Sequence, residues 1–147
     1  MHQFSGGTVG VVDYGVINLR NIVRGLKYVG ADVISSRDCD QLLRADRLIL
    51  PGVGAFGSGI AEMRRLGLDQ AIVEFSTSGR PILGICLGMQ LLLDKSNEYG
   101  EHDGLGIIAG DVVLIPGSKE DDSRRKIPHI GWNTLRPNED GQDWSGS

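Results

Sequence analysis

Long hydrophobic runs and paired cysteines are both missing from this sequence of 147 residues. Its apolar runs are far shorter than the roughly 20 residues that cross a bilayer, and Met1–Gly7 is too polar for a signal peptide. The two cysteines, Cys39 and Cys86, form no CxxC pair and lack the spacing of metal ligands. We therefore expect free thiols in the reducing cytoplasm, with no membrane, metal or cofactor.

An excess of charge of one sign is missing as well. The chain has 15 basic and 19 acidic residues, for a net charge of −4, and the two signs are mixed along its length. Such a balance lacks the basic face of a nucleic-acid-binding protein. Glycine, by contrast, is abundant at 22 residues, which indicates tight turns and close backbone approaches. The length suits one compact domain, and we expect residues 1–147 to form a single one.

Short apolar segments alternate with helical patterns through the first two-thirds of the chain. Strands are predicted at Thr8–Asp13, Ala31–Ser35, Arg47–Leu50 and Pro81–Cys86. Helices are predicted from Leu19 to a stop at Gly30, around Ile60–Leu66, around Leu68–Phe75, and over Leu87–Leu93. This alternation predicts an α/β fold with a parallel sheet flanked by helices, in which ligands bind beyond the carboxyl ends of the strands.

The pattern changes after Gly104. Gly104–Pro116 is typical of one or two antiparallel strands, Lys119–Lys126 is a charged loop, and Ile127–Leu135 is a further strand candidate. The remaining residues, Arg136–Ser147, are polar and show no periodicity. Because no closing strand or helix follows Leu135, we expect a fold that is incomplete at its C-terminal end.

The segment Gly84–Gly88 has the form G-x-nucleophile-x-G, with Cys86 between a predicted strand and a predicted helix. This is the thiol version of the nucleophile elbow, in which two glycines permit a sharp turn. The helix N-terminus favours a thiolate at Cys86, and the N–H of Leu87 can help to hold an oxyanion. The alternative is that Cys86 is a small buried apolar residue, as free cysteines often are.

A glycine-rich loop, Pro51–Gly57, follows the third predicted strand. It matches neither G-x-x-x-x-G-K-[ST] nor G-x-G-x-x-G, so a nucleotide site is poorly supported. Its glycines would let a peptide N–H turn towards an oxyanion beside the nucleophile. A plain tight turn remains the alternative.

Five segments together resemble a known family: DYGVINLRNI from Asp13, PGVGAFG from Pro51, GICLGMQLL from Gly84, GLGIIAGDV from Gly104 and KIPHIGWN from Lys126. They are similar to the class I (triad) glutamine amidotransferases, and more narrowly to the glutaminase subunit of imidazole glycerol phosphate synthase in histidine biosynthesis. The resemblance covers Val9 to about Leu135 and implies a flavodoxin-like, mostly parallel sheet.

The resemblance implies that Cys86 attacks the side-chain amide of glutamine, giving a thioester and ammonia, after which water releases glutamate. The ammonia would pass to a partner, a (β/α)₈-barrel cyclase. The implied residues are Gly52, Val53 and Leu87 for the oxyanion, Gly54, Gln90 and Glu98 for glutamine, and Asn18, His129 and Trp132 for the partner interface. Glu98 as a solvated surface acid and Trp132 as core packing are the alternatives.

The sequence departs from this family in two places. The family's general base is a His in an H-P-E motif, whereas His2, His102 and His129 are the three histidines here and none precedes Pro-Glu. We therefore expect the chain to lack the segment with the catalytic His–Glu pair, and to have little or no glutaminase activity. The second departure is Ile17, where the family usually has Gly before the Asn.

Three other functions stay open from the sequence. An amidotransferase subunit of a bacterial surface-sugar pathway would share this scaffold and supply a different synthetase with ammonia. An inactive relative would only bind a partner. An unrelated cysteine hydrolase would use His129 as its base.

Overall fold

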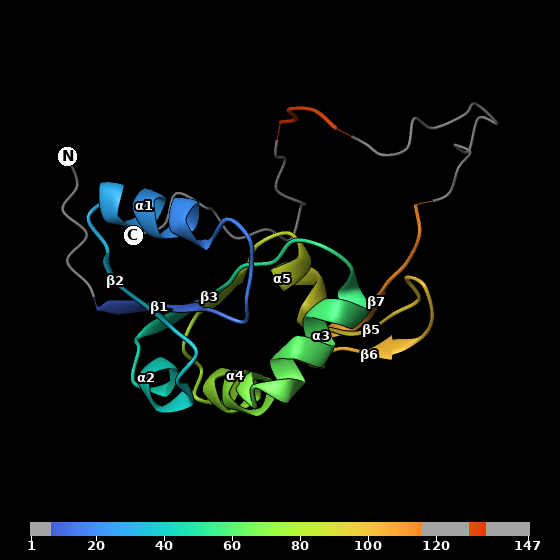
Figure 1. Cartoon of the computed structure of the whole chain (residues 1–147), viewed down its shortest axis with the longest axis horizontal. Helices are drawn as coiled ribbons and strands as arrows, with labels where there is room; N and C mark the ends of the chain where they lie inside the picture. The colour runs from blue at the N-terminus through green and yellow to red at the C-terminus, as the bar shows by residue number, and fades with distance from the viewer. Residues whose placement is uncertain (1–6, 116–129, 135–147) are drawn as a thin grey trace. The chain divides into compact units, whose positions relative to one another are not determined.

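A four-stranded parallel sheet forms the centre of the protein, in a computed structural model that describes residues 7–115 and 130–134 (Figure 1). The strands are β1 (Thr8–Val12), β2 (Asp32–Ser36), β3 (Arg47–Leu50) and β4 (Ile82–Gly84), in the order β2-β1-β3-β4. The two central strands, β1 and β3, are rich in Val, Ile and Leu and mostly buried, as strands covered on both faces require, whereas the edge strands β2 and β4 are more exposed. All four predicted strands are confirmed to within two residues.

Helices cover both faces of this sheet, which confirms the predicted fold class. The helix α1 (Leu19–Tyr28) lies on one face, and α2 (Cys39–Leu43) and α4 (Leu68–Thr77) lie on the other, as Figure 1 shows. The helix α3 (Phe56–Arg65) packs against α4 and also against α5 (Leu87–Leu91). Gly30 ends the first helical segment with a φ of +89°, in the left-handed region that glycine adopts readily.

The two faces of the sheet have cores of different size. Under α1, Val9, Val11 and Ile49 are buried against the half-buried side chains of the helix. The opposite face carries a larger core, in which Phe56, Phe75 and Met63 are fully buried. Leu83 on β4 pairs in register with Ile49 yet is 57% exposed, so α1 does not extend over this strand.

A second, three-stranded sheet corrects the prediction for the segment after α5. It contains β5 (Leu93–Ser96), β6 (His102–Asp103) and β7 (Ile108–Val112), in the order β6-β5-β7. The prediction of a helix through Leu93 was wrong, because the helix ends at Leu91. The prediction of antiparallel pairing in Gly104–Pro116 was also wrong, because β7 runs parallel to β5, and only β6 pairs with β5 antiparallel.

Among the described residues, 7–114 form one compact unit, and Ile115 with residues 130–134 belongs to a second, which is described by itself. Residues 130–134 form a bend without strand geometry, so the strand predicted over Ile127–Leu135 is wrong for these five residues. Outside the described residues lie the rest of that segment, the predicted loop Lys119–Lys126 and the residues after Thr134.

Candidate functional site: a cysteine at the strand-to-helix turn

Cys86 stands in a strained turn between β4 and α5. Its backbone angles are φ 55° and ψ −120°, a combination outside the left-handed helical region and unusual for a residue with a side chain. The thiol is exposed, so the alternative of a buried apolar cysteine is wrong. The backbone thus turns sharply enough to present the sulfur to solvent, as a nucleophile requires.

The glycines on either side of Cys86 are required by close contacts, as the sequence predicted. A Cβ on Gly84 would lie 2.4 Å from Met89 Cα, and a Cβ on Gly88 would lie 1.8 Å from Leu50 O. Both obstacles are backbone atoms, which cannot move aside as a flexible side chain would. The start of α5 therefore packs directly onto the end of β3.

Two of the backbone amides at the start of α5 donate hydrogen bonds within the turn, and the first one does not. Gly88 N–H donates to Ile85 O at 3.0 Å, and Met89 N–H donates to Cys86 O at 3.0 Å. Within the described part of the chain, the N–H of Leu87 donates none of the hydrogen bonds that close this turn. This amide is therefore not used in closing the turn, and the role of Leu87 in holding an oxyanion stays a prediction.

The glycine-rich loop after β3 meets the nucleophile turn at Gly52. A Cβ on Gly52 would lie 2.5 Å from Gly88 N, 2.7 Å from Leu87 Cβ and 2.6 Å from the hydroxyl of Tyr14. Three loops, which follow β1, β3 and β4, therefore converge at the carboxyl edge of the sheet. Gly52 and Leu87, two of the predicted oxyanion residues, are in contact.

Tyr14 is a site residue that the sequence did not single out. Its hydroxyl is buried and donates a hydrogen bond of 2.7 Å to Pro51 O. Burial, together with the nearby charge of the Cys86 thiolate, raises the pKa of Tyr14 to about 12. The hydroxyl lies beside Gly52, which also contacts the start of α5 directly after Cys86. Its position directly after the first strand was the available signal, because that edge of the sheet is where ligands bind.

The loop continues through Val53 and Gly54 to the start of α3. Val53 is 48% exposed, and Gly54 has a φ of +105°, which a residue with a side chain would adopt only under strain. The loop ends at Phe56, whose N–H donates to Glu98 Oε2 at 2.8 Å. An exposed peptide between two fixed ends suits a donor that turns towards an oxyanion.

Glu98 thus has a structural contact in addition to its predicted role in binding glutamine. Its own N–H donates to the hydroxyl of Ser96, which is completely buried, at 3.1 Å. The neighbouring His102 stacks on Phe56 with ring centroids 6.5 Å apart and leaves no room for a side chain on Gly57. The β5–β6 turn is therefore attached to the N-terminal end of α3, and Ser96 and His102 were both missed at the sequence level.

A cavity of about 210 Å³ lies between the loop after β1 and the loop after β3. Its lining includes Tyr14, Ile17, Val53, Gly54 and Glu62. Asn18, the predicted partner contact, follows at the start of α1 with a φ of +83° and is exposed. Ile17 is 80% exposed, so this departure from the family pattern changes a surface and not the core.

Gln90 is half-buried on α5, one turn after Cys86, where its N–H donates to Cys86 O at 3.2 Å. Trp132, in the second unit, is fully exposed, so the alternative of core packing is wrong for it. His129 lies outside the described residues. The structure therefore brings Gly52 and Leu87, two of the predicted oxyanion residues, to the turn that holds Cys86. The predicted partner contacts His129 and Trp132 are not placed relative to this turn.

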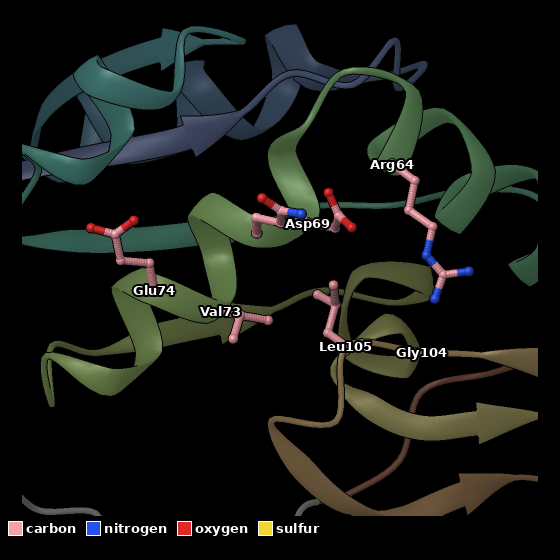
Figure 2. Close-up of a pocket in the computed structure, with 7 residues that line it drawn as sticks. Arg64, Asp69, Val73, Glu74, Gly104 and Leu105 are labelled. Atoms are coloured by element: carbon pink, nitrogen blue, oxygen red, sulfur yellow. The ribbon is translucent and has the colours of Figure 1, made fainter.

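A larger cleft lies away from Cys86. It has a volume of about 340 Å³ and lies between α3, α4 and the chain after β6, lined by Arg64, Asp69, Gln70, Val73, Glu74, Gly104 and Leu105 (Figure 2). Arg64 donates to Asp103 O at 3.1 Å, which ties α3 to the second sheet. The predicted site residues take no part in this lining, and we assign the cleft no role.

Among residues 7–115 and 130–134, no group of three or more His, Cys, Asp or Glu side chains is arranged to hold a metal ion. In the same residues, no helix is long and apolar enough to cross a membrane.

The sequence is similar to curated bacterial proteins over most of its length. Imidazole glycerol phosphate synthase subunit HisH 1 of Legionella pneumophila (strain Lens) is 47% identical over 137 residues, which are 93% of this chain and 64% of that protein. The HisH subunit of Wolinella succinogenes is 46% identical over 85% of this chain and 60% of its own length. The chain thus spans less than two-thirds of the length of these relatives.

Solved structures share the fold. A structure described as a glutamine amidotransferase superposes with a TM-score of 0.62 at 24% identity, covering 71% of this chain and 55% of the other. A putative peptidase E protein of Listeria monocytogenes EGD-e gives a TM-score of 0.58 at 17% identity, covering 74% of this chain and 66% of the other. The family model described as glutamine amidotransferase class-I matches residues 10–144, nearly the whole sequence, and the chain therefore belongs to that family.

Proposed function

We propose that this protein is a glutaminase subunit that releases ammonia from glutamine for imidazole glycerol phosphate synthesis in histidine biosynthesis. One observation supports this most strongly. Cys86 is exposed in a strained turn directly after β4, and Gly52, in the loop after the neighbouring strand β3, lies against this turn. The similarity to HisH subunits supports the choice of pathway. The cytoplasm is the expected location, since this biosynthesis uses soluble metabolites and a reduced thiol.

In the proposed reaction, the thiolate of Cys86 attacks the side-chain amide carbon of glutamine. The carbonyl oxygen becomes an oxyanion, which the N–H groups of Val53 and Leu87 receive once the Gly52–Val53 peptide has turned. The carbon–nitrogen bond then breaks, and the nitrogen takes up a proton and leaves as ammonia. Water attacks the γ-glutamyl thioester and releases glutamate and the free thiol.

The substrate would lie between the two loops that meet at Gly52. Gly54, with its exposed backbone, would admit glutamine beside the loop, and Gln90 would hold it from α5. Glu98 is exposed and retains one carboxylate oxygen beyond the one that accepts from Phe56. That oxygen would receive the α-ammonium group of glutamine, for which a carboxylate is the natural partner.

We further propose that the polypeptide of these 147 residues turns over glutamine slowly by itself. None of its three histidines stands in the H-P-E sequence that supplies the general base. A general base contributes roughly 10²- to 10⁴-fold to such reactions. His102, within the described residues, packs its ring on Phe56 and Gly57, a contact that suits a structural role.

The proposed partner is a (β/α)₈-barrel cyclase that receives the ammonia. Asn18 and Trp132 are both exposed, which suits contact residues, and His129 is proposed for the same interface from its place in the sequence. Trp side chains are favoured anchors at protein interfaces.

A second candidate is an amidotransferase subunit of a bacterial surface-sugar pathway. The observation that favours it is Ile17, an exposed apolar residue in the loop before α1, where Gly is usual in the histidine-pathway subunits. A different side chain on this loop fits a different synthetase. An inactive relative that only binds its partner would also tolerate the lack of an H-P-E sequence.

Alkylation by a chloroketone analogue of glutamine tests the proposal. We expect the reagent to modify Cys86, glutamine to protect it, and Cys86→Ser to abolish the labelling, both alone and with a barrel cyclase added. Cys39 is the internal control, because it is half-buried and its sulfur lies 3.6 Å from Gly67 O. Labelling at Cys39 in place of Cys86 would contradict the assignment, and rapid glutamine turnover would contradict the proposed low activity.

A further inference from the structure

The backbone at Tyr14 is fixed on both sides. Asp13 N–H donates to Ser36 O at 2.9 Å, which extends the pairing of β1 with β2. Gly15 N–H donates to Asp13 Oδ1 at 3.1 Å, and the Arg37 guanidinium, 2.9 Å from Asp13, holds the pKa of that carboxyl below its usual value. The Tyr14 side chain is 5% exposed and belongs to the larger core. Its hydroxyl is therefore held in one place.

That hydroxyl holds one particular peptide of the glycine-rich loop. It donates to Pro51 O at 2.7 Å, and because a peptide group is planar, this bond also fixes the direction of the Gly52 N–H. The preceding carbonyl, Leu50 O, accepts from Ile85 N–H at 2.9 Å. Two consecutive carbonyls are thus fixed, the first by the nucleophile turn and the second by Tyr14.

The loop leaves this fixed region immediately after Gly52. Val53 is 48% exposed and Gly54 has a φ of +105°. The next fixed point is Phe56, whose N–H donates to Glu98 at 2.8 Å. Rotation about the backbone of Gly52 and Val53 changes the direction of one peptide N–H without moving either end of the loop.

We infer that Tyr14 is a positioning residue for the oxyanion loop: its hydroxyl holds the Pro51–Gly52 peptide against the start of α5, so that rotation is confined to the Gly52–Val53 peptide. This inference rests on the proposed function, because it assigns the loop an oxyanion to bind. Without the hydroxyl, rotation spreads back to Pro51, and the Val53 N–H spends less time beside Cys86. With a pKa of about 12, the hydroxyl remains a donor throughout the neutral range.

The test compares two reagents on Tyr14→Phe, which keeps the ring and removes the hydroxyl. The Cys86 thiolate adds to the carbonyl of a chloroketone analogue of glutamine, which gives a transient oxyanion before the sulfur displaces chloride and forms a thioether. Iodoacetamide loses iodide by direct displacement and only requires an accessible thiolate. We expect the maximal rate of chloroketone labelling to fall about fivefold, the effect of one hydrogen bond, with an unchanged half-saturating concentration and an iodoacetamide rate within about twofold. Tyr28→Phe is the matched control, since Tyr28 is 91% exposed on α1.

Equal chloroketone rates in Tyr14→Phe and the wild type would overturn the inference, as would an equal loss with both reagents, which indicates general disturbance of the turn. Amide hydrogen exchange provides a second measurement that needs no chemistry at Cys86. We expect faster exchange over Gly52–Gly54 in Tyr14→Phe than in the wild type, and unchanged exchange over α4. Unchanged exchange over Gly52–Gly54 would also overturn the inference. If the chloroketone fails to label wild-type Cys86, the proposed function fails, and exchange still decides whether Tyr14 holds the loop.

Discussion

Replacing Gly88 with alanine would place a methyl group where the structure leaves no room. The added Cβ would lie 1.8 Å from Leu50 O, against the 3.0 Å below which real Cβ atoms essentially never come. Gly88 has no positive φ, so the cost of the substitution is steric and not conformational. The start of α5 must therefore move away from β3 by more than an ångström.

The magnitude follows from what that movement breaks. Forcing an extra methyl group into a packed site costs about 1–3 kcal/mol. Leu50 O also accepts from Ile85 N–H at 2.9 Å, and losing this bond costs about 1 kcal/mol more. We expect Gly88→Ala to lower the free energy of unfolding by roughly 2–4 kcal/mol, with a fall in Tm of about 10 °C.

Urea unfolding followed by circular dichroism measures this difference. Gly25→Ala is the matched control, because Gly25 lies in the middle of α1 and a Cβ there meets nothing within 4 Å. We expect this control to gain about 0.5–1 kcal/mol, because alanine loses less conformational entropy than glycine in a helix. A Gly88→Ala variant within about 1 kcal/mol of the wild type would refute the close approach of α5 to β3.

Two further predictions concern Glu98 and Tyr14. Glu98→Gln keeps an acceptor for the Phe56 N–H, so we expect a free energy of unfolding within about 0.5 kcal/mol of the wild type. We also expect this variant to bind the glutamine chloroketone more weakly. Glu98→Ala should bind the chloroketone more weakly as well, and its free energy of unfolding should fall by about 1 kcal/mol. Equal chloroketone binding by Glu98→Gln would contradict a role in holding glutamine. For Tyr14, the folded-state pKa of about 12 lies above the ordinary tyrosine pKa of 10.0, so the stability linked to it is present below pH 10 and is lost as pH rises towards 12. Alkaline denaturation compared with Tyr14→Phe measures this, and identical pH profiles of the two proteins would contradict the shift.

The parallel sheet was predictable because its strands are short apolar runs with clear ends. Arg47–Leu50 was predicted to the residue, since Pro51 and Gly52 follow it directly. The turn at Cys86 was predictable for the same kind of reason. Its two glycines indicate that backbone segments approach closely there, and the contacts at Gly84 and Gly88 show this.

The second sheet was not predictable by the same reasoning. Leu93 continues the apolar spacing of α5, yet it lies in β5 and pairs with Ile108 of β7. A contact between residues distant in the sequence thus overrides the local pattern. The short helix α2 was not predicted; Asp38 caps its N-terminus, and the Asp38 carboxylate accepts from Gln41 N–H at 3.0 Å. Tyr14 was missed because one hydrogen bond to a carbonyl 37 residues away leaves no periodicity.

The strained backbone at Cys86 lowers the stability of the folded state. A residue with a side chain held at φ 55° and ψ −120° costs about 1–3 kcal/mol, whereas glycine would adopt these angles at little cost. The chain therefore carries at this turn a residue that makes the folded state less stable than the simplest alternative would. Cys86 contributes nothing to the core and costs folding energy where it stands, as we would expect of a residue with the proposed role of nucleophile.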